Sequence, residues 1–260
     1  MLRASGLTFR AGGRALIEDV SAVFQPGRLH LIIGPNGAGK STLVKLLSRM
    51  LRPHSGRVKF GERDASRLGE RELATYRAVL SQAVEVAFPI PVYELVMMGR
   101  YPHFRGRPGL SDERICEEAM RYFDLAEFSE RSYGTLSGGE RQRVNFARVL
   151  AQVWEPVAGS ARYLFLDEPL TFLDIRHQID VMHKVRKFAR QPDVVAVGVV
   201  HDLNLAAKFA DRLILLHHGH ILVDGGTAEV LTPQHLHTAF EVTPTLLTNP
   251  ATGELHLTFD

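Results

Sequence analysis

The sequence predicts an α/β fold with a mainly parallel sheet, an antiparallel β part at the N-terminus and an inserted block of helices. Strand-like and helix-like segments alternate in the first and last thirds of the chain, as is typical of a parallel sheet covered by helices. Between about residues 83 and 160, long helical patterns dominate instead. A glycine-rich loop stands between a short apolar strand and a helical pattern, an order typical of folds that bind phosphates.

The predicted strands are apolar runs bounded by turn residues. In the first part of the chain they are Leu2–Phe9, Val20–Phe24, Leu29–Ile33 and Arg57–Phe60. In the last part they are Tyr163–Leu166, Val194–Val200 and a hairpin of Arg212–Leu216 with His220–Val223. Apolar residues at helical spacing predict helices over Lys40–Met50, Val92–Gly99, Ser111–Phe123, Gly138–Val153, Ile175–Arg190 and Leu203–Ala210.

The composition limits the classes of function. The 260 residues are 45% hydrophobic and 23% charged, which is ordinary for a soluble globular protein. The 31 basic and 29 acidic residues nearly balance, so no nucleic-acid partner is expected. We find no signal peptide at Met1–Ser5 and no window near the roughly 18 apolar residues of a membrane span, so work at a membrane would require a partner. The single cysteine, Cys116, cannot form an intramolecular disulfide and is expected to be a small buried residue.

The glycine-rich loop satisfies the pattern G-x-x-x-x-G-K-[ST] in full. Its residues are Gly34, Pro35, Asn36, Gly37, Ala38, Gly39, Lys40, Ser41 and Thr42. Glycines let backbone N–H groups point inward, and the following helix directs its positive end at the phosphates. In such a loop Lys40 reaches the β- and γ-phosphates and Ser41 offers a hydroxyl to Mg²⁺. The loop predicts binding of ATP and Mg²⁺. By itself it leaves kinases, GTPases, helicases and transporter ATPases open.

Two adjacent carboxylates follow the buried strand Tyr163–Leu166. Because side chains alternate along a strand, Asp167 and Glu168 are expected to point in different directions. Asp167 then suits the Mg²⁺ shell, while Glu168 suits the orientation of an attacking water, a division that phosphoryl transfer requires. The alternative is a strand end capped by solvated charges, and only the phosphate loop argues against it.

The segment that narrows the class is Leu136, Ser137, Gly138, Gly139 and Glu140, followed by Arg141-Gln142-Arg143. Ser137 precedes a helix whose unpaired N–H groups form an anion site; the alternative is a capped helix without a ligand. The segment resembles the signature of the ATP-binding-cassette (ABC) family, and the resemblance covers about Leu2 to Leu236. It implies an ABC nucleotide-binding domain in a homodimer, where this helix end faces the γ-phosphate held by the other subunit. One chain would then supply half of each active site.

The same resemblance assigns the remaining site residues. Gln82 stands where the family's metal- and water-contacting glutamine occurs, Asp174 lies in the loop that crosses the dimer interface, and His201 matches the switch histidine beside the catalytic glutamate. It also divides the chain into an α/β core (1–82 and 161–236), a helical signature subdomain (83–160) and a short C-terminal extension (237–260). One residue departs from the pattern: Ala11 falls where the family stacks an aromatic ring on adenine, with Phe9 as a possible substitute.

Two runs resemble ATPases that power the import of iron–siderophores, haem and vitamin B12: Met98–His103 and Leu173–Gln178. The segment Val153–Pro156 with its insertion to Arg162, and the closing segment through Phe240, are most similar to the haem branch. The resemblance implies haem import through two multi-span permease subunits fed by a periplasmic haem-binding protein. It places the chain peripherally on the cytoplasmic face of a bacterial inner membrane. The remote alternative, a soluble ABC protein of DNA repair or translation, usually carries a second cassette or a long insertion.

Three further patterns lead to expectations about surfaces. The prolines at 89 and 91 are expected to expose apolar side chains toward the membrane partner, and Met97 and Met98 face either that partner or the helical core. Arg100, Arg105 and Arg107 are expected to form a solvated basic loop, with lipid headgroups as the alternative ligand. Finally, the three histidines His217, His218 and His220 at a hairpin tip are not expected to converge on a metal ion.

Overall fold

The computed structural model describes residues 1–81, 89–171, 173–250 and 253–259. Its centre is a six-stranded sheet in the order β10-β9-β3-β8-β7-β6. Five strands run parallel, and β10 pairs antiparallel at one edge. The strands are β3 (Arg28–Ile33), β6 (Arg77–Leu80), β7 (Arg162–Leu166), β8 (Val194–Val199), β9 (Arg212–His217) and β10 (His220–Gly225).

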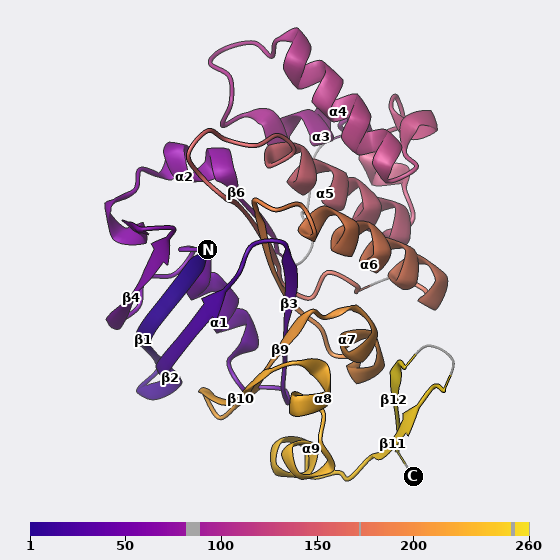
Figure 1. Ribbon diagram of the computed structural model, residues 1–260. Coiled ribbons are helices and arrows are strands. Elements are labelled where there is room, and N and C mark those ends of the chain that lie inside the picture. Colours follow the sequence, from indigo (N-terminus) through magenta and orange to yellow (C-terminus); the bar gives the residue numbers. More distant parts are fainter. Residues whose placement is uncertain (82–88, 172, 251–252, 260) are drawn as a thin grey trace.

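A second, antiparallel sheet covers the N-terminal side of the molecule (Figure 1). Its order is β2-β1-β4-β5, from β1 (Leu2–Ala11), β2 (Arg14–Phe24), β4 (Ser55–Phe60) and β5 (Arg63–Asp64). It packs with α1 (Lys40–Leu47) against one face of the central sheet, through residues such as Ile32, Val197 and Phe165. Alternate residues on the same strands, such as Leu31 and Ala196, face the opposite core. Because side chains alternate along a strand, this sheet is buried on both faces, as its continuous apolar runs require.

The opposite core contains the helical block and two helices of the last third (Figure 1). The block contains α3 (Val92–Met97), α4 (Leu110–Tyr122) and α5 (Gly138–Gln152). The sheet is covered by α6 (Ile175–Ala189) and α7 (Leu203–Phe209), and α2 (Glu70–Tyr76) precedes β6. The chain ends with α8 (Thr227–Val230), α9 (Pro233–Phe240) and the hairpin of β11 (Thr245–Thr248) and β12 (Leu255–Thr258), which docks on α7. The predicted fold class is therefore confirmed.

Two expectations about surfaces are wrong. Ile90 and Val92, beside the prolines, are buried in the core and not exposed, because α3 packs against α4 and α5. Arg100 does not belong to a solvated loop with Arg105 and Arg107, since it is only 5% exposed. Its guanidinium bonds a carboxylate and a carbonyl inside the helical block.

Met97 faces the helical core rather than the partner surface, and Cys116 is buried as expected. Met97 lies in the core, and the Cys116 thiol contacts its sulfur at 3.7 Å. Burial raises the pKa of Cys116 to about 12, so the thiol stays protonated and unreactive at neutral pH. Met98 is half-buried against the same core.

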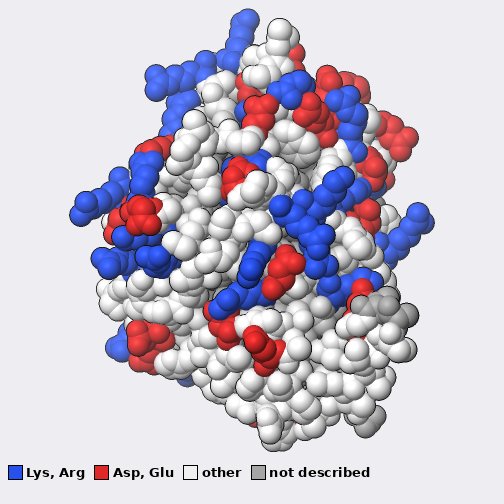
Figure 2. Space-filling view, viewed as in Figure 1, with Lys and Arg blue, Asp and Glu red and all other residues white. Residues whose placement is uncertain are grey.

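Charges are mixed on the face drawn in Figure 2. Basic and acidic side chains are interspersed over the upper part, whereas the lower part around α8, α9 and the C-terminal hairpin carries few of them. None of the helices in the described ranges is long and apolar enough to cross a bilayer.

Candidate nucleotide site

The glycine-rich loop joins the end of β3 to the start of α1, and it packs tightly against its neighbours. Gly34 has a φ of +149°, and a Cβ there would lie 2.1 Å from the carbonyl oxygen of Leu216. Gly39 has a φ of +101°, and a Cβ there would lie 2.4 Å from the carbonyl oxygen of Leu16. Only glycine fits either position, because a side chain would displace backbone as well as strain its own.

Lys40, the first residue of α1, turns its ammonium back along the loop. Its Nζ donates to the carbonyl oxygens of Gly34 at 2.8 Å and Pro35 at 2.9 Å. The residue is 5% exposed, and this burial lowers its pKa, against the opposing effect of Glu168 and Asp167. The loop thus holds one cation next to the start of a helix, an environment suited to phosphate.

Ser41 and Asp167 form the second part of the site. Asp167 follows β7, is 6% exposed and accepts a hydrogen bond from the Ser41 side chain. Its Oδ1 has no hydrogen-bond partner among the described residues. Burial raises the pKa of Asp167, because the charged carboxylate has lost solvent. A hydroxyl beside a buried, under-satisfied carboxylate is a donor set that fits Mg²⁺.

Glu168 and His201 lie in contact at the carboxyl ends of neighbouring parallel strands. Glu168 Oε1 is 2.9 Å from His201 Nε2, and their side chains are 23% and 49% exposed. Glu168 has a φ of 52°, an uncommon conformation for a residue with a side chain, of a kind that recurs at functional sites. The next residue after His201, Asp202, caps α7 by accepting from the amides of Asn204 and Leu205, at 2.7 and 3.0 Å. The cap fixes the start of α7 directly after His201.

A cleft of about 440 Å³ opens beside the loop. It is lined by Gly34–Ala38 and His201, and also by His217, His218 and residues 239–241. The sequence does not predict that His217, His218 or residues 239–241 lie near the loop. A signal existed for the histidines: β9 lies beside β3, so the residues after both strands meet at one edge of the sheet.

The signature residues lie on α5, in the helical block. Ser137 caps this helix: its Oγ accepts from the Glu140 amide at 3.3 Å, and Glu140 Oε2 accepts from the Ser137 amide at 2.7 Å. As far as the described ranges go, neither residue lines the cleft beside the loop. The start of α5 is tied to the Glu168 loop instead, since Gln142 Nε2 donates to the Pro169 carbonyl at 2.6 Å.

The other predicted residues lie apart from the loop or outside the described ranges. Asp174 is the exposed N-cap of α6, and its Oδ1 accepts from the amide of His177 at 2.9 Å, which lowers its pKa. Ala11 is exposed at the tip of the β1–β2 hairpin, while the ring of Phe9 packs edge-on against His54 at 5.2 Å. Gln82 falls outside the described residues.

The histidine-rich hairpin joins β9 to β10. The rings of His217 and His218 lie 4.0 Å apart, whereas His220 Nε2 is 3.4 Å from Glu18 Oε2. Across the described ranges, no group of three or more histidine, cysteine or acidic side chains is arranged to hold a metal ion.

Residues 17–171 match the family described as ABC transporter. The chain is 47% identical to the Hemin import ATP-binding protein HmuV of Gloeobacter violaceus, over 97% of this chain and 92% of that one. It is 40% identical to the protein of the same name from Escherichia coli O157:H7, over 96% of each.

Solved structures agree on the fold. The subunit of a metal-chelate type ABC transporter in an inward-facing conformation superposes with a TM-score of 0.83 at 24% identity, covering 100% of this chain and 97% of that one. An ATP-binding cassette in a dimeric, post-hydrolysis state with ADP and phosphate superposes with a TM-score of 0.73 at 24% identity, covering 87% of this chain and 99% of that one. The family match spans more than half of the residues, and relatives above 40% identity span nearly all of them. The chain therefore belongs to the ABC transporter family and is one of its ATP-binding subunits.

Proposed function

We propose that this chain is the ATP-hydrolysing motor of a haem importer. The observation that carries the assignment of ATP hydrolysis is the contact of Glu168 with His201, next to Ser41, the buried Asp167 and the phosphate loop. Phosphoryl transfer needs a cradle for the phosphates, a metal position and a group that orients the nucleophile. All three kinds of group lie at the carboxyl ends of β3, β7 and β8, where α/β folds place their ligands.

In the proposed reaction the backbone N–H groups of the glycine-rich loop and the Lys40 ammonium hold the β- and γ-phosphates of ATP. Ser41 and Asp167, with Gln82, would hold Mg²⁺, which when bound offsets charge on the phosphate oxygens. The Glu168 carboxylate accepts a hydrogen bond from a water and aims it in line with the bond to the leaving ADP. His201 keeps that carboxylate in place, and its half-exposed ring is available to the γ-phosphate.

The second half of each site comes from a second copy of the chain. The capped N-terminus of α5, with Leu136–Glu140, offers unpaired amides and a positive helix end to an anion. Within the described ranges these residues do not line the loop's cleft. The resemblance to the family's signature is what supports placing them over the partner's nucleotide. Asp174, exposed at the start of α6, is proposed to cross the same interface.

The cargo is proposed from the relatives. Proteins named for hemin import match this chain at 39–47% identity over most of its length. Haem would pass through two multi-span permease subunits, after delivery by a periplasmic haem-binding protein, and never through this subunit. The chain would lie peripherally on the cytoplasmic face of the inner membrane, contacting the permease through the segment that ends at His103. Iron–siderophore or vitamin B12 import by the same motor is the second candidate.

The test is reconstitution of the chain with its permease in proteoliposomes supplied with the haem-loaded binding protein. We expect hemin to stimulate ATP hydrolysis, and Glu168→Gln to lower the rate about 10²- to 10⁴-fold while ATP still binds. The matched control is Glu117→Gln, which neutralises an exposed glutamate on α4 and should leave the rate unchanged. Normal hydrolysis by Glu168→Gln would remove the catalytic assignment. If an iron–siderophore or vitamin B12 stimulates ATP hydrolysis and hemin does not, the proposed cargo is wrong and that ligand takes its place.

A further inference from the structure

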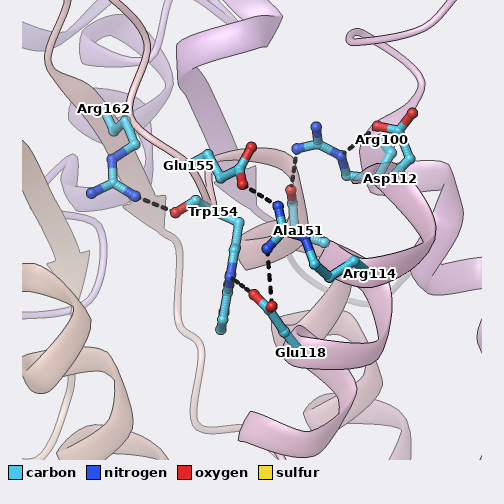
Figure 3. A network of polar contacts seen from close by, with 8 residues as sticks. All are labelled: Arg100, Asp112, Arg114, Glu118, Ala151, Trp154, Glu155 and Arg162. Atoms are coloured by element: carbon cyan, nitrogen blue, oxygen red, sulfur yellow. Dashed lines mark hydrogen bonds and ion pairs between the residues drawn. The ribbon is translucent and has the colours of Figure 1, made fainter. Parts of the chain in front are cut away.

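The C-terminal end of the signature helix α5 is held by basic and polar side chains from two other segments, the turn that follows α3 and the start of β7. The last carbonyls of a helix have no partner within it, and they attract positive charge. Arg100 Nη1 donates to Ala151 O at 2.7 Å, His103 Nε2 lies 2.7 Å from Gln152 O, and Arg162 Nη1 donates to Val153 O at 3.0 Å. Figure 3 shows Arg100 and Arg162 reaching this helix end from opposite sides. These hydrogen bonds therefore fix the C-terminus of α5, as the Ser137 cap fixes its N-terminus.

Arg100 does more than cap. Its Nε donates to Asp112 Oδ1 at 3.0 Å, and both side chains are nearly fully buried. The second carboxylate oxygen of Asp112 accepts from the Gly109 amide at 3.0 Å, at the start of α4. One planar guanidinium thus joins α4 to the end of α5 (Figure 3).

The backbone next to Arg100 touches α5 directly. A Cβ at Gly99 would lie 2.1 Å from the carbonyl oxygen of Arg148, so only glycine permits this approach. The turn Met98–Arg100 therefore lies against the α5 backbone with no space between them. Contact and hydrogen bonds together make the turn and α5 one rigid unit.

Immediately after this turn the chain becomes accessible. Tyr101 is 56% exposed, and its ring meets Phe104 edge-on at 5.6 Å. A shallow groove of about 790 Å³ runs between this aromatic pair and α2, where Arg71 donates to the Phe104 carbonyl at 2.8 Å. An exposed tyrosine that contacts a half-buried phenylalanine beside a groove is a surface that can receive a partner, here the permease of the proposed function.

We infer that Arg100 is a positioning residue that couples the Tyr101–Phe104 surface to the signature end of α5. The inference rests on the proposed function, because the permease is what displaces this surface. A push on Tyr101–Phe104 is carried through Arg100 to Ala151. It then moves Ser137, about 22 Å away at the other end of a 15-residue helix, relative to the partner's nucleotide. Arg100 touches neither nucleotide nor cargo.

The decisive variant is Arg100→Lys, which keeps the charge and the apolar stem. A single ammonium lacks the planar fork that reaches Ala151 O and Asp112 together. We expect ATP hydrolysis by the purified subunit to stay within about twofold of wild type. Stimulation of hydrolysis by the assembled permease should fall at least about fivefold, with uptake of hemin falling in parallel. Asp112→Asn, which weakens the same link from the other side, should behave alike.

The matched control is Arg114→Gln, on α4, the helix that also carries Asp112 (Figure 3). Arg114 is half-exposed, and its ion pairs with Glu118 and Glu155 do not involve an α5 carbonyl. It should leave both rates unchanged. If Arg100→Lys lowers ATP hydrolysis equally in the purified subunit and in the assembled transporter, the residue has a merely structural role. If the permease stimulates the variant as strongly as wild type, Arg100 has no coupling role. If the permease stimulates the wild-type subunit but hemin has no effect, the proposed cargo is wrong. The ratio of the ATP hydrolysis rates with and without the permease still tests Arg100.

Discussion

At the scale of single residues, Asp167 lowers the free energy of unfolding at a position that the proposed function requires. Its carboxylate is buried, one oxygen has no partner within the described ranges, and burial raises its pKa. A raised pKa means that the folded protein binds the proton more tightly than the unfolded chain does. Ionised Asp167 therefore lowers the free energy of unfolding at neutral pH, unless a cation compensates the charge.

Asp167→Asn should consequently stabilise the nucleotide-free protein. We expect a gain of about 1 kcal/mol at pH 7, or a melting temperature roughly 2–4 °C higher, together with loss of Mg²⁺-dependent hydrolysis. The gain should shrink as the pH falls through the raised pKa and disappear below the ordinary aspartate value of 3.8, where the wild-type group is neutral in both states. Thermal melts of both proteins across this pH range measure it. A variant that is less stable than wild type at pH 7 would contradict the argument.

Residue chemistry was easier to predict than residue burial. The sequence predicts that four site residues meet at one edge of the sheet: Ser41, Asp167, Glu168 and His201. Each of them follows a strand or the glycine-rich loop, and those strands are neighbours. Arg100 could not be distinguished from Arg105 and Arg107 in the same way. Its burial depends on the carbonyl of Ala151, 51 residues further along the chain, and no local pattern signals that contact.

At the scale of elements, the start of β7 and the end of α5 are joined by a buried arginine. Arg162 is fully buried, and it bonds both carboxylate oxygens of Asp193 at 2.7 and 2.8 Å as well as the α5 end. This side chain links the strand that precedes Asp167 to the helix that begins at Ser137. The ion pair also lowers the pKa of Asp193, so its contribution is present above the ordinary value and is lost in acid.

Arg162→Met should therefore destabilise the fold strongly. It keeps the apolar stem but leaves Asp193 and the α5 carbonyls without their donor, and breaking a buried pair in this way costs about 3–5 kcal/mol. Urea denaturation at pH 7 measures the loss. Arg121→Gln, which removes an exposed pair with Glu117, should change the free energy of unfolding by less than about 1 kcal/mol. A comparable loss in both variants would show that Arg162 has no special role.

The elements themselves could be predicted from the sequence, but their ends were less accurate. The helix expected over Val92–Gly99 ends at Met97, and a tighter turn follows because Gly99 must approach the Arg148 carbonyl. The helix expected over Lys40–Met50 ends at Leu47, with Arg49 in a left-handed conformation at φ 61°. In both cases a tertiary contact or a local turn stops a pattern that apolar spacing alone would continue.

At the scale of the whole molecule, the layered α/β core was predictable and the placement of the C-terminal hairpin was not. Parallel strands need covering helices, so alternation along the chain indicates the core. The hairpin β11–β12 docks on α7 through Asn204, whose side chain exchanges two hydrogen bonds with the backbone of Leu257 at 2.8 and 3.1 Å. Such a long-range amide contact has no periodic signature in the sequence.

The shared active site is the last prediction, and it concerns two molecules at once. Lys40→Ala removes the phosphate cation, and Ser137→Asp keeps an N-cap of equal quality while opposing an anion with its charge. Each pure variant should be inactive. In a mixed dimer of the two, one site pairs the intact Lys40 of one chain with the intact Ser137 of the other. An equimolar mixture allowed to exchange subunits should therefore recover about a quarter of the wild-type rate, since half of its dimers carry one intact site of two.

The matched control places both substitutions in one chain and mixes it with wild type. In those mixed dimers each site then lacks either Lys40 or Ser137, so the mixed species should be inactive and only wild-type dimers should contribute. If each chain carried a complete site of its own, the two experiments would give the opposite order: no recovery from the mixed single variants, and half-active mixed dimers from the double variant. ATP hydrolysis measured after subunit exchange therefore separates a site built from two chains, with Ser137 of one over Lys40 of the other, from a site contained in one.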